Sequence, residues 1–219
     1  MSAVVIVQPS GPLRTNVVLV GDPERREAIA IDPAIPSLST IVGAAAEQGW
    51  RIVLAVVTHG HWDHMGELAA LSEHVWRHEQ RELSIGVHPL DQDRLLHPRP
   101  IAAPFPIPEV VPSRELRDGE TIHAGRVALR VLHTPGHTEG SVSFHDQAAG
   151  VLFSGDTLFR GAWGRTDLPG GDERAMLESL QRLATLDPAT RVIPGHGEET
   201  TIDAESVWIQ RAARRGSLA

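Results

Sequence analysis

The chain of 219 residues contains no cysteine, no tyrosine and no lysine, and all 20 of its basic residues are arginine. Without cysteine, the protein has no disulfide bond, no thiol nucleophile and no thiolate to offer a metal. No apolar run has the length of a membrane-spanning helix, and no basic leader followed by an apolar segment stands at the N-terminus. We therefore expect a cytoplasmic protein that does not bind membranes.

The composition is that of an ordinary globular protein. Apolar residues make up 41% of the chain and charged residues 22%, and the formal charge is −8 at pH 7. A chain of this length can bury a sizeable core, so we expect a single domain over residues 1–219. The acidic balance disfavours a nucleic-acid partner, because phosphate backbones attract basic surfaces. These features do not distinguish a monomer from a homodimer.

Four potential metal ligands occur within six residues of the first half. The motif H-G-H-W-D-H contains His59, His61, Asp63 and His64, and it follows an apolar segment, 51–57, that is typical of a buried strand. If the chain stays extended beyond this strand, residues 59, 61 and 63 project to one side and residue 64 enters the next turn. Three imidazoles and a carboxylate this close together are costly to bury without a cation. The motif therefore predicts a metal site.

Three further donors follow strand-like segments in the second half. His137 lies in H-T-P-G-H, Asp156 in F-S-G-D-T and His196 in V-I-P-G-H-G. In each place an apolar run gives way to a glycine-containing turn, as expected where the carboxyl ends of several strands meet at one site. The glycines at 60, 155 and 195 are interpreted as residues that permit tight turns.

The number of ligands restricts the kind of site. A closed structural zinc site has four ligands and usually includes cysteine, whereas this chain offers five imidazoles and two carboxylates. Seven donors are too many for one tetrahedral ion. A carboxylate shared between two ions would give each ion four protein ligands and leave a position for water. We therefore predict an open two-metal centre.

The order and spacing of these motifs resemble the metallo-β-lactamase superfamily over most of the chain. The resemblance implies an α/β (α+β) fold, a four-layer αββα sandwich of two mixed sheets with helices outside. It implies two divalent ions, zinc or iron, or else manganese. By the same resemblance one ion would be held by His59, His61 and His137, the other by Asp63, His64 and His196, and both by a bridging Asp156.

Within this superfamily, the segment G-D-T-L-F-R-G-A-W-G-R-T-D-L-P-G-G-D is similar to that of glyoxalase II (hydroxyacylglutathione hydrolase) and of persulfide dioxygenases. Longer glyoxalase II proteins have a C-terminal helical domain and tyrosines that help to bind glutathione. Only 23 residues follow His196, and the chain has no tyrosine. The closer resemblance is to the short glyoxalase II-like proteins of bacteria, and we expect the glutathione-binding domain to be absent.

This resemblance implies a metal-dependent hydrolase of a small-molecule thioester, such as S-lactoylglutathione or a related acyl-thiol. Water between two cations becomes hydroxide near neutral pH, and the cations stabilise the oxyanion that its attack creates. Asp63 would ligate a metal and orient this nucleophile, and Asp156 would hold the two ions together. A thiolate leaves without a strong general acid, so a thioester suits the site.

The main alternative is a mononuclear iron persulfide dioxygenase, which would use His59, His137 and Asp156 and has a similar G-R-T-D loop. Bound iron with oxygen uptake would distinguish it from a hydrolase. The absence of tyrosine disfavours a lactonase, the loop pattern disfavours a β-lactamase, and the acidic charge disfavours an RNA-processing nuclease. A binding module without activity is disfavoured because all seven ligands are present.

Other residues near the motifs are weaker candidates. Arg165 is predicted either to bind a substrate carboxylate or to pair with an aspartate of its own loop. Trp62 and Trp163 are predicted to lie either at the rim of the site or in the core. His133 and Thr157 adjoin the expected ligands, where they either support them by hydrogen bonds or pack within the strands.

The first half is predicted to begin with an antiparallel meander and to continue with helices and strands. Strands are expected at 3–7, 16–20, 28–31 and 84–88, and helices at 41–48 and 67–77. The second of these helices should carry His64 in its first turn. His74 and His78 stand four residues apart on it, but without an H-E-x-x-H pattern they indicate a solvated face rather than a metal site.

The second half is predicted to repeat this arrangement. Strands are expected at 126–132, 141–145, 151–154 and 191–193, and helices at 172–186 and 204–215. Residues 98–112, which contain six of the 16 prolines, join the two halves. They cannot form a helix or a central strand, and we interpret them as a stiff crossover. Phe105 and Ile107 are alternatively expected to wall a substrate cleft.

Overall fold

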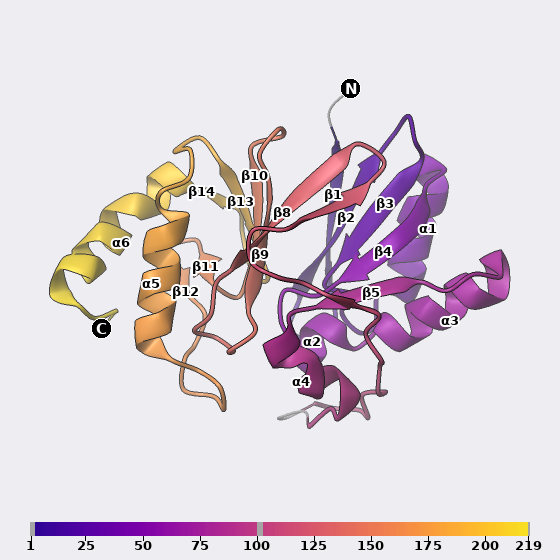
Figure 1. The fold of residues 1–219 in the computed structure, drawn as a ribbon, viewed down its shortest axis with the longest axis horizontal. Coiled ribbons are helices and arrows are strands. Elements are labelled where there is room, and N and C mark those ends of the chain that lie inside the picture. The colour runs from indigo at the N-terminus through magenta and orange to yellow at the C-terminus, as the bar shows by residue number, and fades with distance from the viewer. Residues whose placement is uncertain (1–2, 100–102, 219) are drawn as a thin grey trace.

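Two six-stranded sheets lie face to face in the computed structural model, which describes residues 3–99 and 103–218 (Figure 1). In the first sheet β1, β2 and β3 form the antiparallel meander that was predicted, and β3 to β6 pair in parallel. In spatial order its strands are β1 (Val4–Ser10), β2 (Thr15–Asp22), β3 (Glu27–Ile31), β4 (Arg51–Val56), β5 (Ser84–Val87) and β6 (Arg114–Glu115).

The second sheet is also mixed. Its β10 and β13 pair in parallel, and its other neighbours are antiparallel. In spatial order its strands are β14 (Thr200–Thr201), β13 (Arg191–Pro194), β10 (Val151–Gly155), β9 (Val142–Asp146), β8 (Val127–His133) and β7 (Thr121–Ala124). Strands β11 (Leu158–Phe159) and β12 (Ala162–Trp163) form a separate two-stranded hairpin.

Helices cover the outer face of each sheet. Figure 1 shows α1 (Leu38–Gln48) and α3 (Leu68–Glu79) beside the first sheet, and α5 (Glu173–Leu183) and α6 (Ile202–Arg215) beside the second. The short helices α2 (Trp62–Met65), η1 (Pro89–Asp91) and α4 (Gln92–Leu96) belong to the connections of the first half. The predicted αββα sandwich is confirmed. Among the described helices, none combines the length and apolar character needed to cross a membrane.

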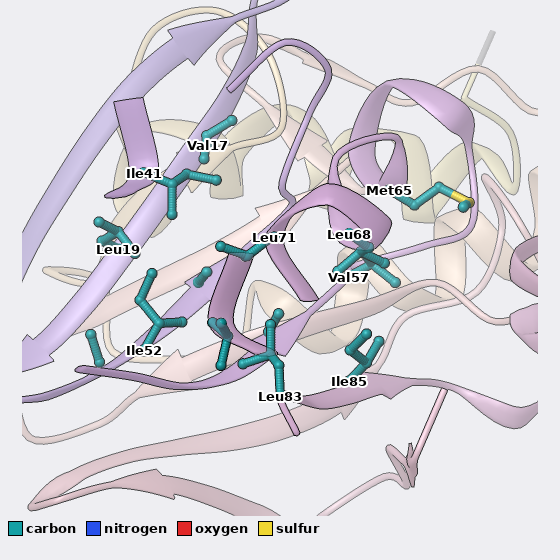
Figure 2. Packing of buried hydrophobic residues seen from close by; sticks show 14 of the residues in the cluster. Val17, Leu19, Ile41, Ile52, Val57, Met65, Leu68, Leu71, Leu83 and Ile85 are labelled. Atoms are coloured by element: carbon teal, nitrogen blue, oxygen red, sulfur yellow. The ribbon is translucent and has the colours of Figure 1, made fainter. Parts of the chain in front are cut away.

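Three apolar clusters fill the three spaces between these four layers. In the first, α1 and α3 contribute Ile41 and Leu71, which pack against the outer face of the first sheet (Figure 2). A second cluster joins the two sheets, and a third lies between the second sheet and the helices α5 and α6. Each sheet is therefore buried on both faces.

Strand β2 shows how the sequence produces this double burial. Val17 and Leu19 enter the cluster under the helices, while Val18 and Val20 enter the cluster between the sheets. Successive side chains of a strand point to opposite faces, so a continuous apolar run supplies both. Such a run is costly to expose, which fixes the strand in the centre of the molecule.

The predicted helices differ from the observed ones mainly at their ends. Helix α1 begins three residues earlier than predicted, because the Glu67 carboxylate accepts hydrogen bonds from the free N–H groups of Ser37 and Leu38, at 2.6 and 3.2 Å. His64 was predicted to lie in the first turn of α3, but it lies in the separate helix α2. The short elements β6, β7, β14, η1 and α4 were not predicted, since segments of two to five residues show little periodicity.

The proline-rich crossover contains neither helix nor strand in its described part, residues 98–99 and 103–112, as predicted. Residues 100–102 of this prediction lie outside the description. Ile107 packs against the first apolar cluster, and the ring of Phe105 meets that of Trp62 edge to face at 5.7 Å. The crossover therefore packs against the core through Ile107 and contacts Trp62 of the candidate site through Phe105.

Candidate metal centre

The predicted ligands meet where strands of both sheets end. His59 follows β4, His137 follows β8, Asp156 follows β10 and His196 follows β13. The sheets are tied together at this edge, because the Val142 N–H donates to the Thr58 carbonyl at 2.8 Å and the Asn16 N–H donates to the Gly195 carbonyl at 2.7 Å. Convergence of strand ends, inferred from the motifs, is thus confirmed.

His59, His61 and His137 form the first triad. The Nδ1 atom of His61 lies 3.1 Å from Nε2 of His59 and 2.8 Å from Nε2 of His137. A tetrahedral ion with bonds of ~2.0–2.1 Å separates two of its ligand atoms by about 3.4 Å, so these nitrogens are nearly at the spacing of a common metal. His59 and His137 are buried, whereas His61 is half-buried.

Asp63, His64 and His196 form the second triad. Nε2 of His64 lies 3.3 Å from Nε2 of His196, and Oδ2 of Asp63 lies 3.5 Å from the former and 3.2 Å from the latter. Asp63 was predicted to extend from the strand, but it stands in the first turn of α2. The helix turn brings Asp63 and His64 to one point, which an extended chain would not do.

Asp156 lies between the two triads. Its Oδ1 is 3.4 Å from Nε2 of His64, and its Oδ2 is 3.6 Å from Nε2 of both His137 and His196. Oδ1 is buried and has no hydrogen-bond partner among the described residues. A buried carboxylate oxygen without a donor is costly, and a cation would satisfy it. The residues present therefore fit a divalent metal site.

Burial favours the neutral form of two imidazoles of the first triad, those of His59 and His61. Burial, followed by the nearby His64, lowers the pKa of His59 well below its usual value. Burial likewise lowers the pKa of His61 to about 3. A neutral imidazole presents the lone pair that a metal binds.

The second triad has the opposite electrostatic character. Burial lowers the pKa of His64, but Asp32, Asp156 and Asp63 outweigh it and raise the pKa to about 10. Burial raises the pKa of Asp63, but His64 and His196 hold it below its usual range. The carboxylates thus favour positive charge here strongly enough to overcome desolvation, as a cation site requires.

Hydrogen bonds on the far side fix four of the imidazole rings. Nδ1 of His59 donates to Thr58 Oγ1 at 3.1 Å, and Thr58 Oγ1 donates in turn to Asp32. Nδ1 of His64 lies 2.9 Å from an Asp32 oxygen. The remaining two rings bond backbone carbonyls, His137 to Arg165 at 2.8 Å and His196 to Leu13 at 3.0 Å. Each of these rings is therefore held with Nε2 toward the centre.

A cavity of about 1030 Å³ opens onto the exposed side of this centre. His61, Asp156 and His196, the more exposed ligands, line it. Its walls are largely apolar and include Trp62, Leu90, Phe159 and Leu168. Three arginines also line it, at positions 94, 99 and 165. Asp93 and Glu139 line it as well, so the cavity presents charges of both signs beside its apolar walls.

The sequence matches the model of the metallo-beta-lactamase superfamily over residues 10–196. The chain belongs to this superfamily. Hydroxyacylglutathione hydrolase GloC of Haemophilus influenzae is 30% identical over 206 residues, which cover 90% of this chain and 92% of that relative. Members of the superfamily therefore include a named hydrolase of nearly the same length.

Two solved structures of the superfamily are also similar. The crystal structure of TTHA1623 in a di-iron-bound form is 37% identical with a TM-score of 0.78, covering 92% of this chain and 96% of that one. ETHE1 from Myxococcus xanthus is 25% identical with a TM-score of 0.77, covering 97% of this chain and 87% of that one. The similarity extends to a protein that binds two iron ions in a related fold.

The weaker candidates in this superfamily member lie in different places. Arg165 lines the cavity and pairs with Asp167 at 2.7 Å, which was one of its two predicted roles. Trp62 lines the cavity, half-buried. Trp163 is not among the cavity residues, because its ring packs on that of Trp208 at 5.6 Å. Trp62 therefore lies at the rim, whereas Trp163 is partly buried and packs against the third apolar cluster.

His133 and Thr157 do not support the ligands. The Nε2 atom of His133 lies 2.9 Å from the Glu139 carbonyl, and its ring stacks on His88. Thr157 donates to Thr134. The supporting role falls instead to Asp32 and Thr58, which were not predicted. Asp32 carries the same signal as the ligands, an acid directly after an apolar strand, β3.

Proposed function

We propose that the protein is a metal-dependent hydrolase of small-molecule thioesters, such as S-lactoylglutathione or a related acyl-thiol. The observation that carries this proposal is the pair of ligand triads joined at Asp156 and open to the cavity. The similarity to GloC supports a thioester as the substrate.

The first triad would hold one divalent ion, the second triad another, and Asp156 would contact both. We propose zinc or iron, with manganese as a further alternative, and the di-iron form of TTHA1623 supports iron. When bound, such ions lower the pKa of water and polarise a carbonyl oxygen.

The chain's own groups would position the substrate and its nucleophile. Asp63 stays ionised, so its carboxylate can accept a hydrogen bond from water and orient it. The acyl carbon would approach from the side of His61 and His196, because the opposite side is closed by the buried His59 and His64. A thiolate is a good leaving group, so this reaction does not require a general acid.

The proposal is tested with protein stripped of metal and reconstituted separately with zinc and with iron. Loss of S-lactoylglutathione and oxygen uptake with glutathione persulfide are measured in the same preparations. We expect thioester loss that needs metal, without oxygen uptake. Oxygen uptake confined to the iron form, without thioester loss, would overturn the hydrolase.

A mononuclear iron persulfide dioxygenase is the second candidate, supported by the similarity to ETHE1. It would use His59, His137 and Asp156, of which the last two approach within 3.6 Å. The hydrolase is favoured because the second triad is also complete, and a single iron bound by those three residues would leave it without a role.

Arg99 is predicted to contact an acidic group on the thiol part of the substrate. The other two cavity arginines, Arg94 and Arg165, form ion pairs with carboxylates of the protein, whereas Arg99 forms none within the described residues. Replacing Arg99 by glutamine should raise KM for a glutathione thioester up to about fivefold, which corresponds to about 1 kcal/mol for an exposed ion pair. Steady-state kinetics should show little change in kcat.

The matched control is Arg174→Gln, an exposed arginine on α5 that does not line the cavity. It should leave KM unchanged. An uncharged acyl-thiol should be hydrolysed equally well by the Arg99→Gln variant and the original protein. An equal rise in KM for charged and uncharged substrates would contradict the assignment.

A further inference from the structure

Asp91, at the end of η1, is a buried carboxylate outside the metal-ligand groups. Its exposed fraction is 0%, and it belongs to none of the sets of side chains that could hold a metal. Burial of a charged group is costly unless hydrogen bonds or opposite charges compensate it. The contacts of Asp91 therefore indicate what it does.

Four donors surround the two oxygens of this carboxylate. Oδ2 accepts hydrogen bonds from the Gly60 N–H at 2.7 Å and from the Thr138 hydroxyl at 2.8 Å. Oδ1 accepts from the Gly140 N–H at 3.0 Å and from Nε of Arg94 at 3.3 Å. Bonds of this kind to an ionised acceptor are among the stronger ones in proteins.

Three of these donors, Gly60, Thr138 and Gly140, belong to the two loops that carry the first triad, and Arg94 belongs to α4. Gly60 lies between His59 and His61, and Thr138 follows His137. One carboxylate thus joins a loop of the first half to a loop of the second, 31 and 47 residues away along the chain from Asp91. The two loops face each other across the 2.8 Å separation of the His61 and His137 nitrogens.

Both loops pack closely against Asp91 and Arg94. A Cβ atom on Gly140 would lie 2.6 Å from the Asp91 nitrogen, and one on Gly60 would lie 2.6 Å from Cβ of Arg94. Arg94 extends the connection, since its NH2 group donates to Glu139 and to the Pro169 carbonyl. The segment of η1 and α4 therefore contacts three loops of the site.

We propose that Asp91 is a positioning residue that fixes the geometry of the first triad. It acts through Gly60 and Thr138 on the separation of the three histidine nitrogens. The inference rests on the proposed metal centre, but not on the identity of the substrate. Loss of the carboxylate should weaken metal binding at the first triad and leave the second triad, which Asp91 does not contact, intact.

The test measures metal affinity directly, by competition with a chelator and by metal content, in the full chain with zinc. Asp91→Asn keeps the volume but presents an amide NH2 group to donors. We expect affinity for one equivalent to fall about 10- to 100-fold, as for other groups that orient ligands, and affinity for the second to stay the same. His137→Ala identifies the affected equivalent as the one bound by the first triad.

Glu205→Gln is the control, because Glu205 is another buried carboxylate that accepts three hydrogen bonds, from Gly161, Trp208 and Thr200, away from the histidines. It should lower the melting temperature without changing metal affinity. Thr138→Val, which removes a single donor, should give a smaller loss with the same selectivity and serves if Asp91→Asn does not fold.

Equal weakening of both equivalents in Asp91→Asn, or unchanged affinity in both Asp91 and Thr138 variants, would overturn the inference. Failure of the proposed function gives a different result. The original protein would then bind metal but hydrolyse no thioester, and the selective loss at the first triad would still be measurable.

Discussion

Replacement of Asp156 by alanine is expected to remove metal and activity together while the fold is retained. Its two oxygens approach His64, His137 and His196. The substitution would therefore remove the carboxylate that lies between the two triads and is proposed to contact both ions. The loss should exceed the 10- to 100-fold effect typical of groups that only orient ligands. Metal content after dialysis and thioester turnover measure the effect, and circular dichroism checks the fold.

Asp167→Ala is the matched control for this prediction. Asp167 is an exposed carboxylate of the neighbouring loop, and its ion pair is with Arg165, which is also exposed. Exposed ion pairs contribute about 1 kcal/mol or less, so this variant should keep its metal. If Asp156→Ala kept both metal and turnover, the shared carboxylate and the two-metal account would be wrong.

The convergence of the seven candidate ligands could be predicted because each lies in a short motif directly after an apolar strand. Strand ends on one edge of a sheet converge whatever the details of packing. Asp32 also lies directly after a strand, β3, so its place near the site could have been predicted in the same way. It was not, because Asp32 is not part of a recognisable ligand motif. The two carbonyl groups that hold His137 and His196 carry no sequence signal at all, because every residue has one.

The segment that contains Asp91 could not be predicted for a different reason. Helix α4 has five residues and η1 has three, which is too short for an apolar period to appear. The role of Asp91 depends on loops distant in sequence, and a single chain gives no record of such contacts. The positions of Trp62 and Trp163 could not be predicted for the same reason. Each depends on a contact with a residue distant in sequence, Trp62 with Phe105 and Trp163 with Trp208.

Gly195→Ala is expected to disable the centre although it adds a single methyl group. Gly195 lies in a bend directly after β13, in agreement with its interpretation as a turn residue, and the space around it gives a further reason for glycine. A Cβ atom here would lie 2.2 Å from Oδ1 of Asp156 and 2.7 Å from Cε1 of His64. Both ligands would have to shift, and a displacement of about 1 Å can reduce turnover about 100-fold.

Gly43→Ala separates this effect from any general consequence of adding a methyl group. Gly43 lies in α1, and a Cβ atom there meets nothing within 4 Å. That variant should gain about 0.5–1 kcal/mol of unfolding free energy and keep its metal and turnover. Gly195→Ala should lose metal affinity at the second triad first, because His64 belongs to it. Normal metal affinity and normal turnover in Gly195→Ala would contradict this prediction. They would mean that Asp156 and His64 can shift away from residue 195 without loss of the metal centre.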